Sequence, residues 1–385
     1  MIINNSSRKF VYFDKKTNYI YDGIYDKINL SVVKEINIKA HDRNTSQFYL
    51  RPDIYNEVIE GIIPIPPRSR WKFDGGKFFS LNNKYVSKNL KPEISELTYV
   101  SQKLCSVLFK KKIAIELSGG LDTSLVIGII EDLGYHPSLI GITSSRFEYR
   151  TESYIQEKFN KTHKNSCLID SPESLPFSKL KTTPLHQLPS PTSIFYMNVL
   201  LISNECSKNK IEIVLSGNGF DALLCENTDN LIDNLLPENW HTWMLDDNWL
   251  NEYIFNKHNI FYSSAAGSQL LINCIYSLRK NQKEDLKKSW ARRFFSNYLP
   301  IELVNFTYKA DFSGGFLDGF IYSKNEMSDI FEVAYDVTKC KEFSPSAFED
   351  LYYDLQVPNE ELDKRRISRV SLANWIYGLV RDKVI

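Results

Sequence analysis

The chain has 385 residues, 43% of them hydrophobic and 13% aromatic, a composition typical of a globular protein long enough for two domains with separate cores. Lys and Arg together number 47, as do Asp and Glu, so the overall charge gives no electrostatic footprint for nucleic acid or an anionic membrane as a partner. Six widely spaced cysteines without a CxxC pair argue against zinc, iron–sulfur clusters and a disulfide framework, and the lack of a signal-peptide core or of roughly 18–20 consecutive apolar residues predicts a cytoplasmic protein.

The first 90 residues alternate short apolar and aromatic runs with turns. Strands are predicted at FVYFD, NYIYDGIY and KFFSL, and Asp74-Gly75-Gly76 is predicted to be a hairpin turn. The stretch IIPIPPRSRW (62–71) has too many prolines for a helix or a central strand, so we expect an edge strand or a connector there. This part of the chain is therefore predicted to be a small β-rich unit.

From about residue 95 helical and strand patterns alternate. ISELTYVSQKLCSVLFK has helical spacing, IAIEL follows as a strand, and a helix is predicted from about Asp122 to Leu133, ending at Gly134. The later predicted elements are strand 138–143, helix 151–164, strand 166–170, a helix near 193–208 and strand 211–215. This alternation predicts a parallel sheet covered on both faces. Beyond about residue 230 the chain is predicted to be mainly helical, including a basic amphipathic helix over 364–383 that packs its apolar stripe on the domain.

The stretch IAIELSGGLDTS (113–124) places a glycine pair between a strand and a helix start. Such a turn lets backbone N–H groups point inward, and the helix N-terminus adds partial positive charge. Asp122 would repel a phosphate, but it fits if it holds a divalent cation that phosphates share. We interpret the stretch as a site for a nucleotide with its metal. A plain tight turn with Asp122 as the helix N-cap is the alternative, and neither the P-loop pattern nor GxGxxG is present.

A second stretch, VLSGNGFDALL (214–224), repeats this design. Ser216 and Gly217 follow a strand end, and Asp221 comes shortly after them. In an open parallel sheet ligands bind beyond the carboxyl ends of the strands, where neighbouring loops converge. Two such loops, each with one aspartate, are suited to grip one metal-bound triphosphate.

These motifs together resemble a known family. SGGLDTS resembles the pyrophosphate-loop signature of the ATP pyrophosphatase superfamily, and VLSGNGFDALL is similar to the later SG-[acid]-G-x-D-E loop of class B asparagine synthetases. YLPIELVNFTYKADFSGGF (298–316) resembles the P-x-x-[ILV]…K-x-x-F-S-x-G segment of that family and aligns Lys309 with its lysine. The three matches occur in family order over about residues 95–320.

The resemblance implies an adenine nucleotide alpha-hydrolase-like fold and an AMP-forming mechanism. A carboxylate would attack the α-phosphate of ATP, pyrophosphate would leave, and an amine would displace AMP to form an amide. Mg²⁺ would be held by Asp122 and Asp221, while Lys309 would be catalytic and neutralise developing charge. The residues that the resemblance assigns to ATP, with Ile142 near the adenine, are Leu117, Ser118, Gly119, Gly120, Asp122, Thr123, Ser124, Ile142, Ser216 and Gly217.

The N-terminal part departs from glutamine-dependent members of the family. Those members carry a catalytic cysteine directly after the initiator Met, whereas position 2 is Ile2 and the first cysteine is Cys105. EGIIPIPPRSRWKFDGGKF (60–78) nevertheless resembles the tail of the Ntn-type amidotransferase domain. We therefore expect a reduced, inactive glutaminase-like domain at residues 1–94 and the asparagine synthetase-like catalytic domain at 95–385.

The second loop also departs from the family pattern. The acid that serves as the base for the incoming nitrogen is replaced by Asn218, whose carboxamide cannot accept that proton, and the acid after Asp221 is replaced by Ala222. Glu226 and His241 are conceivable substitutes. Glu116 interrupts the apolar strand IAIEL; a partner on a covering helix is one explanation, and no function is assigned to it.

Branches of this family without a glutaminase use an internal amine, as β-lactam synthetases and lasso peptide cyclases do. The N-terminal remnant, Asn218 and the proline-rich PLHQLPSPTS (184–193) favour the peptide-tailoring branch, namely macrocyclisation of a ribosomally made precursor peptide in antibiotic biosynthesis. The expected partners are that peptide or another carboxylate substrate, and a protease or leader-binding protein. The alternatives are a small-molecule cyclase, an ammonia-dependent amide synthetase, a tRNA-modifying enzyme and a pseudo-enzyme that only binds nucleotide or peptide.

Overall fold

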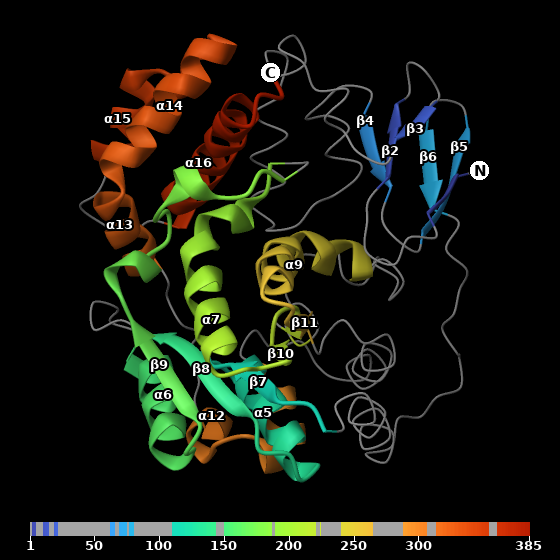
Figure 1. Cartoon of the computed structure of the whole chain (residues 1–385), viewed down its shortest axis with the longest axis vertical. Helices are drawn as coiled ribbons and strands as arrows, with labels where there is room; N and C mark the ends of the chain where they lie inside the picture. Colours follow the sequence, from blue (N-terminus) through green and yellow to red (C-terminus); the bar gives the residue numbers. More distant parts are fainter. Residues whose placement is uncertain are drawn as a thin grey trace.

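The computed structural model describes residues 110–143, 150–186, 189–220, 224, 240–264, 288–305, 313–353 and 360–385, together with six short strands between residues 2 and 80. From β7 onward the elements are arranged around a parallel sheet, and the C-terminal residues form a bundle of helices (Figure 1). Within the described residues, no helix is both long and apolar enough to cross a membrane.

The N-terminal strands form two three-stranded antiparallel sheets with the orders β1-β5-β6 and β3-β2-β4. Their bounds are β1 Ile2–Asn4, β2 Val11–Asp14, β3 Tyr19–Tyr21, β4 Ile62–Ile65, β5 Ser69–Asp74 and β6 Lys77–Ser80. The strands predicted at FVYFD and KFFSL are confirmed as β2 and β6, and the one predicted at NYIYDGIY is confirmed over Tyr19–Tyr21; Asp74 pairs with Lys77 across the predicted hairpin turn. The segment 62–71 was predicted to be an edge strand or a connector, and β4 does lie at the edge of its sheet. The prediction is wrong for residues 69–71, because they belong to β5, which begins after the last proline and lies at the centre of its sheet.

Among the described residues, the parallel sheet has five strands in the order β11-β10-β7-β8-β9. Their bounds are β7 Ile113–Glu116, β8 Ser138–Thr143, β9 Ser166–Asp170, β10 Ile213–Ser216 and β11 Phe261–Ser264. The first strand of this sheet in the sequence, β7, lies at its centre. The chain then adds β8 and β9 on one side of β7, and afterwards β10 and β11 on the other side. The point where the direction of winding reverses therefore lies between β7 and β10, which are hydrogen-bonded neighbours.

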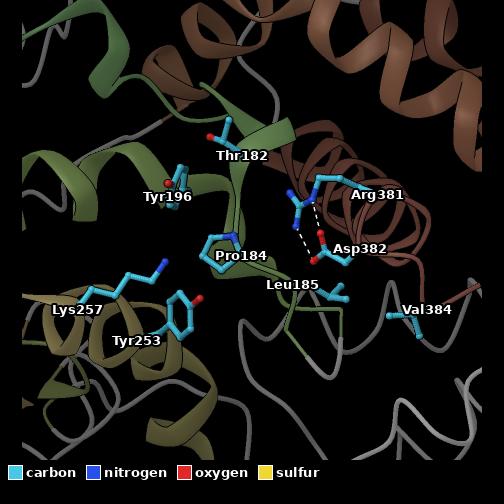
Figure 2. A pocket seen from close by; sticks show the side chains of 9 residues that line it. All are labelled: Thr182, Pro184, Leu185, Tyr196, Tyr253, Lys257, Arg381, Asp382 and Val384. Carbon is cyan, nitrogen blue, oxygen red and sulfur yellow. Dashed lines mark hydrogen bonds and ion pairs between the residues drawn. The ribbon is translucent and has the colours of Figure 1, made fainter.

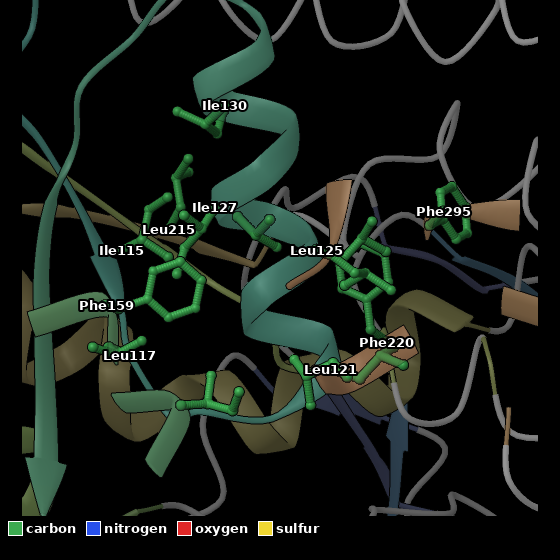
Figure 3. Close-up of a cluster of buried hydrophobic side chains, with 14 of the residues drawn as sticks. Ile115, Leu117, Leu121, Leu125, Ile127, Ile130, Phe159, Leu215, Phe220 and Phe295 are labelled. Carbon is green, nitrogen blue, oxygen red and sulfur yellow. The ribbon is translucent and has the colours of Figure 1, made fainter. Parts of the chain in front are cut away.

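Helices cover both faces of this sheet. Alternate strand residues point to opposite faces, so the apolar side chains of one strand contribute to a core on each side. Ile113 and Ile115 of β7 belong to a core shared with α5 and α6, whereas Ala114 belongs to a core shared with α7 and α9. Figure 3 shows the first core, with Leu125 and Ile127 of α5 among side chains from neighbouring segments. The bounds are α5 Leu121–Asp132, α6 Arg150–Thr162, α7 Tyr196–Lys208, α9 Trp240–Lys257, α11 Ser289–Phe294 and α12 Ile301–Asn305.

A third core holds the C-terminal helices together. Its side chains come from α13 Ser313–Tyr322, α14 Lys324–Thr338, α15 Pro345–Tyr353 and α16 Glu360–Arg381, and from the segment around the short 3₁₀ turns η2 Pro172–Ser174, η3 Leu180–Thr182 and η4 Pro191–Phe195. Two further 3₁₀ turns are η7 Ser296–Tyr298 and η8 Lys341–Phe343. Helix α16 is buried on every side from Arg366 to Ile376, so the predicted packing on the domain is confirmed but the single apolar stripe is wrong.

The predicted elements of the α/β part are largely confirmed. Strands 138–143 and 166–170 match β8 and β9, and the others differ by a few residues at their ends. Helix α5 ends as predicted, because Gly134 has φ +81° and its N–H donates to Glu131, while the Tyr135 N–H donates to Ile130. Strand β11, with the sequence FYSS, was not predicted, because the chain beyond about residue 230 was expected to be mainly helical. The predicted helix before residue 110 lies outside the described residues.

Candidate functional site

The first glycine-rich loop joins β7 to α5 by a tight turn. Gly119 has φ +80°, and a Cβ on this residue would lie 2.2 Å from the carbonyl oxygen of Glu152 in α6, so only glycine fits. The Ser118 and Thr123 hydroxyls are 2.7 Å apart, and the Gly120 N–H donates to the Ser118 hydroxyl over 3.2 Å. The loop is thus folded back onto the first turn of the helix.

The N-terminus of α5 presents backbone N–H groups that the helix itself does not engage. Gly120 is the N-cap and has no side chain to accept from the first N–H groups, while the Ser124 N–H already donates to the Gly120 carbonyl within the helix. N–H groups before Ser124 have no acceptor inside the helix. The alternative in which Asp122 is the N-cap is wrong, because Asp122 lies one residue inside the helix.

The second loop packs directly on this helix start. A Cβ on Gly217 would lie 2.8 Å from the Thr123 nitrogen, so the glycine lets the two loops touch. The Asn218 N–H donates to the Ser216 hydroxyl over 3.1 Å, and Gly219 has φ +86°. The two sequence motifs are therefore brought together at the carboxyl ends of β7 and β10, the place expected from the order of the strands.

Ile142 is tied to the first loop through α6. The side-chain amide of Gln156 donates to the carbonyl oxygens of both Leu117 and Ile142, each over 2.9 Å. A Cβ on Gly141 would lie 2.3 Å from the Leu117 oxygen, so this glycine permits the close approach. The residue expected near the adenine is thus next to the loop expected to bind phosphates.

Asp122 forms an ion pair that sequence reasoning missed. The ammonium of Lys288 lies 2.9 Å and 3.2 Å from the two carboxylate oxygens, and the two side chains are only 11% and 18% exposed. Lys288 immediately precedes α11 and has φ 53°. The two residues are 166 positions apart, so no local pattern could have paired them.

These groups form a donor set that fits a polyphosphate with a divalent cation. It comprises the backbone N–H groups of the first turn of α5, the exposed Ser118 hydroxyl, the Lys288 ammonium, and the Asp122 carboxylate as a candidate metal ligand. Not every assigned residue is placed alike: Ser124 is fully buried, and its hydroxyl has no partner among the described residues. Its position supports the helix start rather than direct contact through the hydroxyl.

A polar cluster centred on the buried Tyr262 lies beside the second loop. The Tyr262 hydroxyl on β11 donates to the Glu116 carboxylate over 3.1 Å and accepts from the side-chain amides of Asn218 and Asn251, over 3.2 Å and 2.9 Å. The Ser264 hydroxyl donates to the Asn218 carbonyl oxygen. Glu116 therefore has hydrogen-bond partners on neighbouring strands, Ser216 of β10 and Tyr262 of β11, and helix α9 joins the cluster through Asn251.

Burial governs the ionisation of this cluster. It raises the pKa of Glu116, although hydrogen bonds from Ser216 and Tyr262 oppose the shift. Burial, and then the charge of Glu116, raise the pKa of Tyr262 well above its usual value, so the phenol keeps its proton at neutral pH. The Tyr262 hydroxyl is consequently a fixed donor to Glu116.

Several predicted residues lie outside the described residues. These are Asp221, the second proposed metal ligand, the proposed catalytic Lys309, and Ala222 and Glu226. His241 falls within α9, of which only the backbone is described at that point. Their roles stay predictions.

A separate cavity of about 350 Å³ lies where α7, α9 and the end of α16 meet (Figure 2). Its lining residues are Thr182, Pro184, Leu185, Tyr196, Tyr253, Lys257, Arg381, Asp382 and Val384. Arg381 is engaged there with the Asp382 carboxylate and with the carbonyl oxygens of Lys181 and Thr183. None of the lining residues comes from the two glycine-rich loops, so this cavity is distinct from the site at the sheet.

Comparisons with known proteins leave the family open. No protein-family model matches the chain, and no curated protein matches it. Among solved structures, NMN synthetase from Francisella tularensis aligns with 10% identity and a TM-score of 0.27, over 58% of this chain and 100% of that one. A score this low leaves the description of the fold to the strand order and the helices themselves.

Proposed function

We propose that the protein is an ATP-dependent ligase that forms AMP and pyrophosphate and joins a carboxylate to an amine. The observation that carries this proposal is the meeting of the SGGLDTS and SGNG loops at the point where the winding of the parallel sheet reverses. A lone glycine turn is common, but two that meet at a helix N-terminus, whose first turn also carries a Lys–Asp pair, form an anion-binding arrangement.

In this proposal the chain's groups have distinct roles. The N–H groups at the start of α5 and the Ser118 hydroxyl bind the phosphates, and the backbone at Leu117 and Ile142 lies by the base. Asp122, with Asp221, holds Mg²⁺, which would offset phosphate charge when bound. Lys288 then exchanges its contact with Asp122 for the phosphates, alongside Lys309.

The bonds exchange in two steps. A carboxylate oxygen bonds to the α-phosphorus while the bridging bond to the β-phosphate breaks, and pyrophosphate leaves. The amine nitrogen then bonds to the acyl carbon while the carbon–oxygen bond to AMP breaks, with AMP keeping that electron pair and the nitrogen releasing one proton to solvent. The finer proposal that the amine and the carboxylate belong to one precursor peptide rests on Asn218, the proline-rich segment 184–193 and the family resemblance.

The proposed function implies a division of the chain into two domains. We propose that residues 1–94 are a shortened glutaminase-like domain and 95–385 the ATP-binding domain. In support, the strands between residues 2 and 80 pair antiparallel, whereas those between 113 and 264 pair parallel.

The proposal is tested by ATP–pyrophosphate exchange. Purified protein is incubated with Mg²⁺, ATP and labelled pyrophosphate, together with the twenty amino acids or linear peptides that have a free N-terminus and one Asp or Glu. Exchange that depends on the carboxylate, and is lost in Asp122→Ala, supports the ligase. A peptide lighter by one water supports macrocyclisation. ATP binding without exchange across the panel would instead favour the pseudo-enzyme.

A further inference from the structure

Asn218 stands where the resembling family carries an acid, and the structure shows what holds its side chain. The residue lies between Gly217 and Gly219 and is exposed, yet its amide nitrogen donates to the Tyr262 hydroxyl, which is 2% exposed. An exposed asparagine on a glycine-flanked turn would ordinarily rotate freely. Here one end of the amide is anchored in the core.

The donor and acceptor positions of the Tyr262 hydroxyl indicate which end of the Asn218 amide faces it. A phenol has one proton and two acceptor positions. The proton goes to the Glu116 carboxylate, so the phenol oxygen faces donors: the NH₂ groups of Asn218 and Asn251, and the hydroxyl of Ser216, which also hydrogen-bonds to Tyr262. If the amide oxygen of Asn218 were turned toward Tyr262, it would face lone pairs of the phenol oxygen. Glu116 therefore sets the orientation of the Asn218 amide through Tyr262, whose proton it accepts.

Within the part of the chain that the structure describes, the opposite end of the amide is available. Nitrogen and oxygen are the two ends of one planar group, so anchoring the nitrogen turns the oxygen away from the buried phenol. Among the described residues, no hydrogen bond uses the Asn218 side-chain oxygen, whereas its backbone N–H and carbonyl are engaged by Ser216 and Ser264. The anchored group is thus an acceptor at the edge where the two loops meet.

We propose that Tyr262, held by Glu116, positions the Asn218 side-chain oxygen to accept a hydrogen bond from the N–H of an uncharged primary amine, the nucleophile of the proposed ligase. This inference rests on the proposed function and deepens it. An amide oxygen accepts a hydrogen bond but cannot take up a proton at neutral pH, so the site selects an amine that arrives neutral. Glu116 and Tyr262 are positioning residues, since neither touches the substrate.

The neighbours of Glu116 keep this arrangement stable near neutral pH. Tyr262 from β11 stays protonated, and Cys206 of α7, whose pKa burial and then the charge of Glu116 raise, stays a neutral thiol. Helix α9 contributes the neutral Asn251. The orientation of the amide therefore depends on Glu116 as a hydrogen-bond acceptor rather than on its charge, and this makes a sharp test possible.

The first arm of the test uses hydroxylamine, which is largely neutral at pH 7.5, with any carboxylate that supports exchange. In Tyr262→Phe and Glu116→Leu, we expect the KM for hydroxylamine in hydroxamate formation to rise about tenfold, with pyrophosphate exchange within about twofold of wild type. Glu116→Gln still offers an acceptor and should stay within about threefold. An unchanged KM in the first two variants, or a loss in Glu116→Gln equal to that in Glu116→Leu, would overturn the proposal.

The second arm does not depend on activity. In protein labelled with ¹⁵N at asparagine, the Asn218 side-chain amide signals are assigned by their loss in Asn218→Ser. They should move in Tyr262→Phe, and signals that stay in place would overturn the proposed anchoring. If wild-type protein showed no pyrophosphate exchange, the proposed function would be refuted. The amide signals would still show whether Tyr262 anchors Asn218, so the two failures are distinguishable.

Discussion

At the scale of single residues, the glycines of the first loop are required for space as well as for backbone conformation. Gly119 and Gly134 have nearly the same φ, +80° and +81°, but a Cβ meets the Glu152 oxygen at 2.2 Å in the first and nothing within 4 Å in the second. The pair therefore separates the effect of crowding from that of φ.

We predict that Gly119→Ala destabilises the protein far more than Gly134→Ala. Both substitutions place an L-residue in the left-handed region, at a cost of about 1–2 kcal/mol. Gly119→Ala should add about 1–3 kcal/mol, because the helix α6 backbone must move. Urea denaturation of both variants measures this difference. Equal midpoints would mean that the loop is not packed against α6 as described.

Lys288 is the cation that the structure adds to the site. Because it is only 11% exposed beside Asp122, we predict that Lys288→Met weakens the affinity for Mg-ATP about tenfold, through loss of a phosphate partner. Lys161→Met is the matched control, since that side chain is 77% exposed on α6. Calorimetric titration with Mg-ATP measures both, and wild-type affinity in Lys288→Met would remove Lys288 from the binding site.

Glu116 predicts a pH dependence of stability. Burial raises its pKa in the folded state, so folding favours the protonated form. The stability associated with this group is complete below the unfolded pKa, about 4.3, and is lost as the pH rises through the folded value. Glu116→Gln removes this loss, so its Tm relative to wild type should increase from pH 4 to pH 7.5. A constant difference across that range would contradict the shift.

At the scale of elements, sequence reasoning succeeded where the signal is local. The strand IAIEL, the glycine pair and the Gly134 helix end are adjacent in the chain, and each has a chemical reason for its conformation. It failed where contacts are distant: Lys288 is 166 positions from Asp122, and Tyr262 is 146 from Glu116. Strand β11 was also missed, because its sequence FYSS lies in the part of the chain predicted to be mainly helical, and in the structure it pairs with β10.

Helix α16 illustrates the same limit, because its charged sequence gave the impression of one solvated face. It is instead the centre of the C-terminal bundle, and the Arg366 side chain is fully buried, with its guanidinium 5.2 Å from the centre of the Phe320 ring. Such a cation is stable there only with partners, and its Nε donates to the Leu351 carbonyl oxygen. A helical pattern alone does not reveal partners of this kind.

We predict that Ile376→Ala in α16 costs about 2–5 kcal/mol, because it opens a cavity in this bundle. Val380→Ala, one turn further along, should cost less than about 1 kcal/mol, since Val380 is 36% exposed while Ile376 is 0% exposed. Denaturant titration followed by tryptophan fluorescence measures both. Similar costs would mean that the end of α16 is as enclosed as its centre.

At the scale of the whole molecule, the order of the strands determines where function is expected. Starting in the middle of the sheet and winding outward in both directions leaves β7 and β10 adjacent, with their loops side by side. The sequence motifs identified these loops separately, and only the topology puts them together. The cavity by α16 lies elsewhere, so we place the chemistry at the sheet.

The most direct test of this account is to identify the nucleotide products. ATP labelled at the α-phosphate, and in a parallel reaction at the γ-phosphate, is incubated with the protein, Mg²⁺ and the carboxylate panel, and the products are separated by thin-layer chromatography. We predict labelled AMP in the first reaction and labelled pyrophosphate in the second. Labelled ADP and inorganic phosphate would show cleavage at the γ-phosphate and would contradict the account.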